Sequence, residues 1–176
     1  MIEAFDAGIL DFFQQIHNPV LTGIYEFFTS IGEAGIVWIL AGMLLLVKSE
    51  HRKYGCILLL SLLMCLIFGN GLLKNLIARP RPCWRHPEVE MLIGIPKDYS
   101  FPSGHTFSSF AGAVSIFYWK RRYGYIAFGL AVLIATSRMY FYVHYPTDII
   151  AGAVMGTAMA LLSICIIQRT EEKRRK

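Results

Sequence analysis

Long apolar runs alternate with short polar segments along most of the chain. The clearest runs cover residues 55–73, 106–119, 123–137 and 149–167, and a shorter run covers residues 34–47. A helix needs roughly 20 predominantly apolar residues to cross a bilayer. The pattern therefore predicts an all-α fold, a polytopic membrane helical bundle in which the short run spans together with its flanks.

The first 31 residues are less regular. Apolar positions within residues 1–15 predict an amphipathic helix at the membrane surface. Residues 18–31 form either a short further span or a helix that only dips into the membrane. The expected total is five to six transmembrane helices. We expect three parts: N-terminal amphipathic or short membrane helices (residues 1–31), a catalytic membrane domain (32–168) and a basic tail (169–176).

Composition supports a membrane protein and argues against two other classes. Hydrophobic residues make up 55% of the chain and charged residues only 16%, whereas soluble domains carry about 25% charged residues. The net charge of +5 does not indicate nucleic acid binding, because the basic residues lie in short segments between helices. The four cysteines show no metal-ligand spacing, so no structural metal is expected.

The basic residues also predict the orientation. With alternating spans, most of them fall on one side, which the positive-inside rule makes cytoplasmic together with the C-terminus. They are Lys48, Arg52, Lys53, Lys120, Arg121, Arg122, Arg169, Lys173, Arg174, Arg175 and Lys176. The remaining six fall on the extracytoplasmic side, and they are Lys74, Arg79, Arg81, Arg85, Lys97 and Arg138. Basic residues there oppose the rule, and binding of an anion is the expected reason.

Three polar segments meet on that predicted outer side. One runs from Lys74 to Arg81, one covers residues 102–105, and one runs from Arg138 to Asp148. Arginine offers a planar fork for phosphate oxygens, and lysine offers a point charge. Ser103 suits the N-cap of a following helix, whose first turn presents free N–H groups to an anion.

His144 and Asp148 lie four residues apart, with Pro146 suited to the first position of a helix between them. Asp148 then sits in the first turn, from where its carboxylate can hold the imidazole N–H. A nucleophile oriented by a third group follows the logic of a catalytic triad. His105 remains as a candidate general acid for the leaving group.

Three motifs carry a family resemblance: K-x6-R-P (Lys74, Arg81), P-S-G-H (residues 102–105) and S-R-x5-H-x3-D (residues 137–148). In this order and spacing they resemble the signatures of the type 2 phosphatidic acid phosphatase (PAP2) family, over about residues 30–168. The resemblance implies a helical core shared with vanadium haloperoxidases and a mechanism without metal or other cofactor. It also implies that His144 is the nucleophile, Asp148 orients it and His105 is the general acid and base. The implied phosphate ligands are Lys74, Arg81, Ser103, Gly104 and Arg138.

Arg79, the apolar loop residues and the aromatic residues each allow a structural interpretation as well as a functional one. Arg79 is a second anion contact or, as we favour, an interfacial charge. The apolar residues 91–95 either cover a lipid tail or anchor their loop in the membrane. Trp38, Trp84, Trp119 and the aromatic residues of 140–145 are expected in belts at the membrane interface.

The expected function is hydrolysis of a lipid phosphate or diphosphate through a phosphohistidine in the plasma or inner membrane, with the active site extracytoplasmic. Undecaprenyl diphosphate is favoured, and phosphatidylglycerol phosphate or phosphatidate are the alternatives. The expected partners are the lipid substrate and the bilayer, and no protein partner is implied. A second enzyme class is vanadate-dependent halide oxidation. The non-enzymatic alternative is a lipid or anion transporter or binding protein, which needs Lys74, Arg81 and Arg138 but no nucleophile.

Overall fold

The computed structural model describes residues 2–175, and within that range the regular elements are all helical. The longer helices are α1 (Ile2–Gln15), α2 (Pro19–Ile31), α3 (Ile36–Val47), α4 (Arg52–Cys65), α7 (Gly104–Trp119), α8 (Arg121–Tyr140) and α9 (Pro146–Arg175). The short ones are η1 (Glu33–Gly35), η2 (Ser49–His51), η3 (Leu66–Leu73), α5 (Lys74–Ile77) and α6 (Pro82–Arg85). The predicted all-α class is confirmed.

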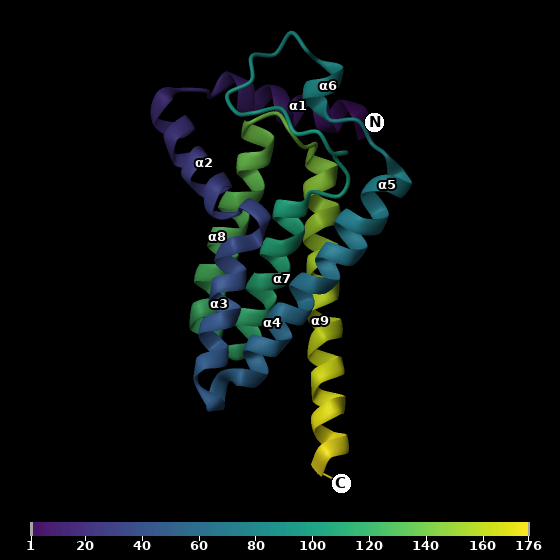
Figure 1. Ribbon diagram of the computed structural model, residues 1–176. Helices are drawn as coiled ribbons and strands as arrows, with labels where there is room; N and C mark the ends of the chain where they lie inside the picture. The colour runs from purple at the N-terminus through teal and green to yellow at the C-terminus, as the bar shows by residue number, and fades with distance from the viewer. Residues whose placement is uncertain (1, 176) are drawn as a thin grey trace.

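Helix α7 occupies the interior of the bundle and packs against α4, α8 and α9 (Figure 1). Its contact with α9 is close because α9 presents glycine there. A Cβ atom added at Gly156 would lie 2.3 Å from the carbonyl oxygen of Phe107, and one at Gly152 would lie 3.0 Å from that of Ser103. The G-x-x-x-G spacing therefore brings two backbones together, as small residues do in membrane helices.

The chain between α4 and α6 changes its helical geometry before it reaches the functional end of the bundle. Helix α4 continues into the π-helical segment η3 and then into α5. Such π-helical segments are often found at functional sites. Helix α5 ends at Ala78, whose φ of 47° lies in the left-handed region. This turn carries Lys74 and Arg81 to the same end of the bundle.

One end of the bundle carries a cap formed by α1 and by the connection between α6 and α7, with the C-terminus at the far end (Figure 1). Helix α1 lies across the bundle there and packs against α8 and α9. It buries Leu10 and Phe13, while Ile2, Phe5 and Phe12 are exposed. This distribution agrees with an amphipathic helix that shares its apolar surface between the protein and its surroundings.

Fewer helices than predicted pass a test of length and hydropathy for membrane spans. Within the described residues, Ser49–Arg85 and Pro146–Lys173 pass it. A third candidate is the pair Pro19–Ile31 and Glu33–Val47, which is bent by 44°. The prediction of five to six spans is therefore too high by this measure. Helix α7 does not pass, because it has only 16 residues, or about 24 Å of helix. Other helices surround it, so it carries serine, threonine and glycine where a lipid-facing helix would carry large apolar side chains.

The predicted interfacial belt is wrong for Trp38 and for residues 140–145. Trp38 is 1% exposed and donates a hydrogen bond to the Ser109 hydroxyl at 3.0 Å. Tyr140, Phe141 and Val143 belong to a buried cluster with Leu10 and Phe13 of α1. These aromatic residues hold α1 against the end of α8 instead of facing lipid. The predicted division into residues 1–31, 32–168 and 169–176 remains a prediction, and the basic segment continues α9 as helix to Arg175.

Candidate active site

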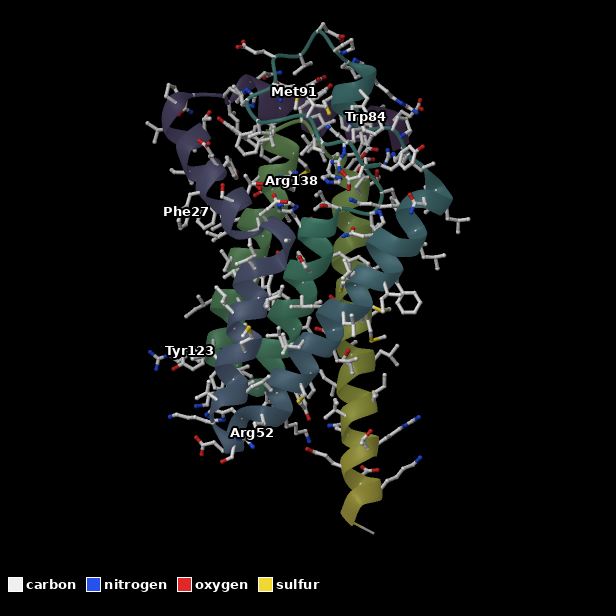
Figure 2. All side chains as sticks on the ribbon, in the orientation of Figure 1. Phe27, Arg52, Trp84, Met91, Tyr123 and Arg138 are labelled. Carbon is white, nitrogen blue, oxygen red and sulfur yellow. The ribbon has the colours of Figure 1, made fainter. Side chains whose placement is uncertain are left out.

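A cavity of about 1150 Å³ lies beneath the cap, between the bend of α2 and α3, the α4–η3 segment and α7. Its polar lining includes six residues, Lys74, Asp98, Arg81, His105, Arg138 and His144, and its apolar lining includes Ile36, Ile39, Leu59, Leu62, Leu63 and Leu66. Figure 2 shows Arg138 inside the bundle below the cap, with Met91 and Trp84 above it. One cavity thus joins a charged pocket to an apolar wall.

Lys74 and Arg81 form the first pair of cations, and both are buried. Asp98 binds both of them: its carboxylate pairs with the Lys74 ammonium and accepts a 2.7 Å hydrogen bond from Nη2 of Arg81. The Asp98 backbone carbonyl accepts a second bond from Arg81 Nε at 2.7 Å. Burial alone would raise the pKa of Asp98, but the Lys74 hydrogen bond and the two positive charges lower it to about 2.

Arg138 supplies a third cation from the last turn of α8. It is 5% exposed, and Nη1 donates a hydrogen bond to the Thr29 hydroxyl of α2. Its Nε has no hydrogen-bond partner within the described part of the chain. A buried guanidinium with an unused donor that lines a cavity is suited to an anionic ligand.

His144 lies in the tight turn between α8 and α9. The turn reverses through Tyr142, whose φ of 56° is left-handed, and the N–H groups of Val143 and His144 donate to the Arg138 carbonyl at 3.1 and 3.3 Å. Left-handed backbone costs about 1–2 kcal/mol for a non-glycine residue. The surrounding aromatic cluster, in which Tyr142 is itself buried, holds the turn in this shape.

The contacts of His144 determine which ring nitrogen is unprotonated. Arg81 Nη1 lies 3.0 Å from Nε2. Because a guanidinium only donates, Nε2 accepts and carries the lone pair, and in a neutral ring the proton lies on Nδ1. Burial, followed by the charges of Arg81 and Arg138, lowers the pKa of His144 well below its usual value. The ring is therefore neutral at physiological pH, with Nε2 directed toward the cations.

Asp148 lies behind His144, away from the cavity lining. Its Oδ2 is 3.5 Å from His144 Nδ1 and accepts a 3.0 Å hydrogen bond from the Tyr145 N–H. Pro146 begins α9, which confirms the predicted helix start. The structure brings the predicted pair together, although the 3.5 Å separation is longer than a typical N–H···O hydrogen bond.

The start of α7 supplies the last part of the site. Ser103 is its N-cap, as predicted, and its hydroxyl accepts a 3.0 Å hydrogen bond from that of Thr106. Gly104 and His105 line the cavity, whereas the fully buried Ser103 does not. His105 Nε2 lies 3.5 Å from a carboxylate oxygen of Glu33 at the bend between α2 and α3. The assignment of Ser103 as a phosphate ligand remains a prediction.

Arg79 has neither of the roles considered for it. It does not line the cavity, and its guanidinium pairs with Asp148 at 2.5 Å and with Asp6 at 2.7 Å. The guanidinium also lies over the Tyr145 ring, 3.9 Å from its centroid. The favoured interpretation as an interfacial charge is wrong, because the fold places Arg79 against a candidate catalytic residue.

Sequence reasoning missed three carboxylates of this region: Asp6, Glu33 and Asp98. Asp6 lies 2% exposed on an otherwise amphipathic helix, and the only signal was its position among apolar neighbours. Asp98 and Glu33 carried no motif. Within residues 2–175, no three His, Cys, Asp or Glu side chains are grouped to hold a metal ion.

The loop between α6 and α7 contacts both the cap and the cavity. Ile93 and Gly94 line the cavity, and Met91 and Ile93 pack against the aromatic cluster. Leu92 and Ile95 are exposed. Ile93 and Gly94 are therefore placed to cover a lipid tail, and Leu92 and Ile95 are placed to anchor the loop in the membrane.

Comparison with known proteins gives consistent matches. Residues 54–172 match the sequence model described as the PAP2 superfamily. An undecaprenyl-diphosphatase of Sulfolobus acidocaldarius is 34% identical, over 83% of this chain and 70% of the relative. Phosphatidylglycerophosphatase B of Bacillus subtilis is 32% identical, over 89% of this chain and 76% of the relative. The crystal structure of Aquifex aeolicus LpxE superimposes with a TM-score of 0.74 at 24% identity, covering 90% of this chain and 94% of that one.

Proposed function

Because this chain is a membrane phosphatase that belongs to the PAP2 superfamily, we propose that it hydrolyses a lipid diphosphate, with undecaprenyl diphosphate as the preferred substrate. The observation that carries the proposal is the single cavity in which His144, His105 and three cations meet an apolar wall. A soluble phosphate ester needs the charged part alone. A lipid phosphate needs both parts, because its chain must remain out of water while its headgroup reacts.

The proposed reaction has two displacements. Nε2 of His144 attacks phosphorus, the bond from phosphorus to the leaving oxygen breaks, and His105 gives that oxygen a proton. Water, deprotonated by His105, then attacks the phosphohistidine, the phosphorus–nitrogen bond breaks and phosphate leaves. Lys74, Arg81 and Arg138 stabilise the charge on the phosphoryl oxygens in both steps. The unprotonated Nε2 and its contact with Arg81 support this order of events.

The apolar wall supports a lateral approach of the lipid chain. Ile36 and Ile39 of α3 face Leu59, Leu62 and Leu66 of the α4–η3 segment across the cavity. Each buried methylene contributes about 0.8 kcal/mol. A few methylenes of a prenyl or acyl chain therefore supply several kcal/mol of binding that a free headgroup lacks.

We propose that the active site faces the extracytoplasmic side and that the C-terminus is cytoplasmic. Arg52 and Tyr123 lie at the end of the bundle opposite the cap (Figure 2). Lys53 and Arg122 adjoin these two positions in sequence, and Lys48 precedes Arg52 by four residues. A concentration of Lys and Arg at one end favours the cytoplasm for that end, which supports the opposite side for the cavity.

Replacement of His144 tests the chemistry. We expect H144A, purified in detergent, to release phosphate from undecaprenyl diphosphate at less than about one-thousandth of the wild-type rate, as in other enzymes that lose a nucleophile. H51A is the matched control, because His51 lies in η2 next to Arg52, at the end of the bundle opposite the cap. Acid-labile phosphate trapped on the wild type and absent from H144A supports the phosphohistidine. Full activity of H144A refutes the assignment of His144 as the nucleophile.

A panel of substrates tests the lipid. Equal concentrations of undecaprenyl diphosphate, phosphatidylglycerol phosphate and phosphatidate are compared by kcat/KM in the same detergent. We expect the diphosphate to be preferred. A preference for phosphatidylglycerol phosphate would instead extend the likeness to phosphatidylglycerophosphatase B and overturn the substrate assignment without affecting the mechanism. Halide oxidation upon addition of vanadate would overturn the reaction class.

A further inference from the structure

Arg79 and Asp6 form an ion-paired chain that ends on the carboxylate behind the proposed nucleophile. Arg79 Nη1 donates to Asp148 Oδ1 at 2.5 Å, and Nη2 donates to Asp6 Oδ2 at 2.7 Å. Asp148 uses its other oxygen toward His144 and the Tyr145 N–H. The order Asp6, Arg79, Asp148, His144 therefore joins the N-terminal helix to the reacting ring.

Asp6 also binds the start of α9. Its Oδ1 accepts the Thr147 N–H at 3.0 Å, and its Oδ2 accepts the Thr147 hydroxyl at 2.8 Å. The Thr147 N–H belongs to the first turn of α9, where backbone donors lack partners within the helix and a negative charge is favourable. A carboxylate from another helix thus caps the helix that carries Asp148.

The burial of these groups shows that the arrangement is specific. Asp6 is 2% exposed and Asp148 is fully buried. A buried carboxylate is costly unless it is paired and hydrogen-bonded, and here each oxygen of both carboxylates faces a donor. Asp6 offers no group to the cavity, and Arg79 does not line it either. Neither residue therefore contacts a bound phosphate, and any effect on the reaction must pass through Asp148.

The charges give each residue a distinct part. Arg79 holds Asp148 Oδ1, so Oδ2 remains directed toward Nδ1 of His144. Arg79 alone would also neutralise Asp148 and weaken its attraction for the ring, which becomes positively charged when Nε2 is phosphorylated. Asp6 balances Arg79, so one net negative charge stays behind the ring. This is the arrangement that an orienting carboxylate needs to hold the tautomer and stabilise the charged ring.

We propose that Asp6 and Arg79 are positioning residues of the phosphatase reaction, through which the N-terminal helix α1 holds Asp148 against His144. The proposal rests on the proposed function, because it assumes that His144 is the nucleophile. It extends the catalytic machinery to a segment outside residues 54–172, the part that matches the family.

Four variants test the proposal with steady-state kinetics across pH in detergent. D6N and R79Q remove opposite charges, and R79K keeps the charge but loses the fork that contacts two carboxylates. D11N is the matched control, because Asp11 is an exposed acid on the same helix. We expect kcat to fall about tenfold in D6N, R79Q and R79K, with KM within twofold of the wild type, and no change in D11N.

The pH profile separates positioning from general destabilisation. Charged or titratable groups face His144 from every surrounding element: Asp148, Arg81, Arg138, Lys74 and His105. They remain in all four variants. Loss of the Asp6 charge makes protonation of His144 less favourable, so the acid limb of kcat/KM moves to lower pH by a few tenths of a unit. Loss of the Arg79 charge moves it to higher pH, and R79K leaves it in place.

The outcomes are decisive. Opposite shifts of the acid limb in D6N and R79Q, together with a reduced kcat in D6N, R79Q and R79K, support the proposal. Wild-type kcat in D6N or R79K overturns it, and so do shifts of the same sign in D6N and R79Q. Should D6N fail to yield folded protein, judged by gel filtration and thermal unfolding, R79Q and R79K decide. Failure of the proposed function is distinguishable, because it appears as an active H144A.

Discussion

Asp98 offers the sharpest test of how the site binds phosphate, because its carboxylate already contacts two of the three cations assigned to the substrate. A phosphate that binds Lys74 and Arg81 must compete with it. We expect D98N, which keeps the shape but loses the charge, to bind inorganic phosphate and vanadate more tightly than the wild type.

The magnitude follows from the pKa of Asp98, which is lowered from an ordinary 3.8 to about 2. One unit corresponds to about 1.36 kcal/mol, so the two cations favour the ionised form by roughly 2.5 kcal/mol before screening. The side chain is 55% exposed, and exposed ion pairs contribute at most about 1 kcal/mol. We therefore expect the inhibition constant for phosphate to fall about fivefold.

The sign of the pH dependence also follows. A carboxyl group with a lowered pKa contributes its attraction above the unfolded-state value and loses it only as the pH falls through the folded-state value near 2. Asp98 therefore stays ionised throughout an assay from pH 5 to 8. The ratio of the inhibition constants of wild type and D98N should be constant over this range, once both are measured at the same phosphate ionisation.

The assay is competitive inhibition of lipid phosphate hydrolysis by phosphate and by vanadate. E88Q is the matched control, since it removes the same charge from the same loop at an exposed side chain, one that pairs with His86. Weaker phosphate binding in D98N would refute the reasoning. It would mean that Asp98 orders Lys74 and Arg81 for the substrate more than it competes with the substrate.

Three further predictions follow from other contacts. G156A should lower thermal stability and kcat together, because its Cβ would lie 2.3 Å from the Phe107 carbonyl and would push apart the helices that carry His105 and Asp148. The control G129A has open space around the added Cβ and should be neutral or stabilising by up to about 1 kcal/mol. The profile of kcat/KM against pH should be bell-shaped. Its acid limb should lie below about pH 6.5, because burial and neighbouring cations lower the pKa of His144. A flat rate from pH 5 to 9 would contradict the two-histidine scheme. EDTA should leave phosphate release unchanged within about twofold, and activity that disappears with EDTA and returns with Mg²⁺ would contradict a metal-free mechanism.

The sequence predicted the helical class and several of the residues that line the cavity, because these depend on local patterns. Apolar runs mark helices, and the spacings within motifs are short. Ser103 as an N-cap and Pro146 as a helix start follow from single-residue preferences that tertiary structure did not override.

Features that depend on contacts between distant segments escaped prediction. Asp6 and Arg79 are 73 positions apart in the chain and meet only because α1 folds across the bundle. The burial of Trp38 and Tyr140 was missed for the same reason, since an aromatic residue near a helix end looks alike in an interface belt and in a packed core. Fewer helices than predicted qualify as spans by length and hydropathy, in part because α7, which other helices surround, is short and carries serine, threonine and glycine.

The carboxylates of the site also change how substrate binding should respond to salt. The sequence showed six basic residues on the predicted outer side, which suggested an exposed cationic surface. In the structure Lys74, Arg81 and Arg138 are buried, and Asp98 lies against the first two. Bound phosphate then exchanges with a carboxylate and does not neutralise a bare positive patch. Buried charges such as these three cations are screened far less than exposed ones, so we expect KM in non-ionic detergent to change less than about threefold between 50 and 500 mM salt. A steep rise of KM with salt would show that exposed residues such as Arg85 and Lys97 capture the headgroup first, and R85Q with K97Q would then remove that dependence.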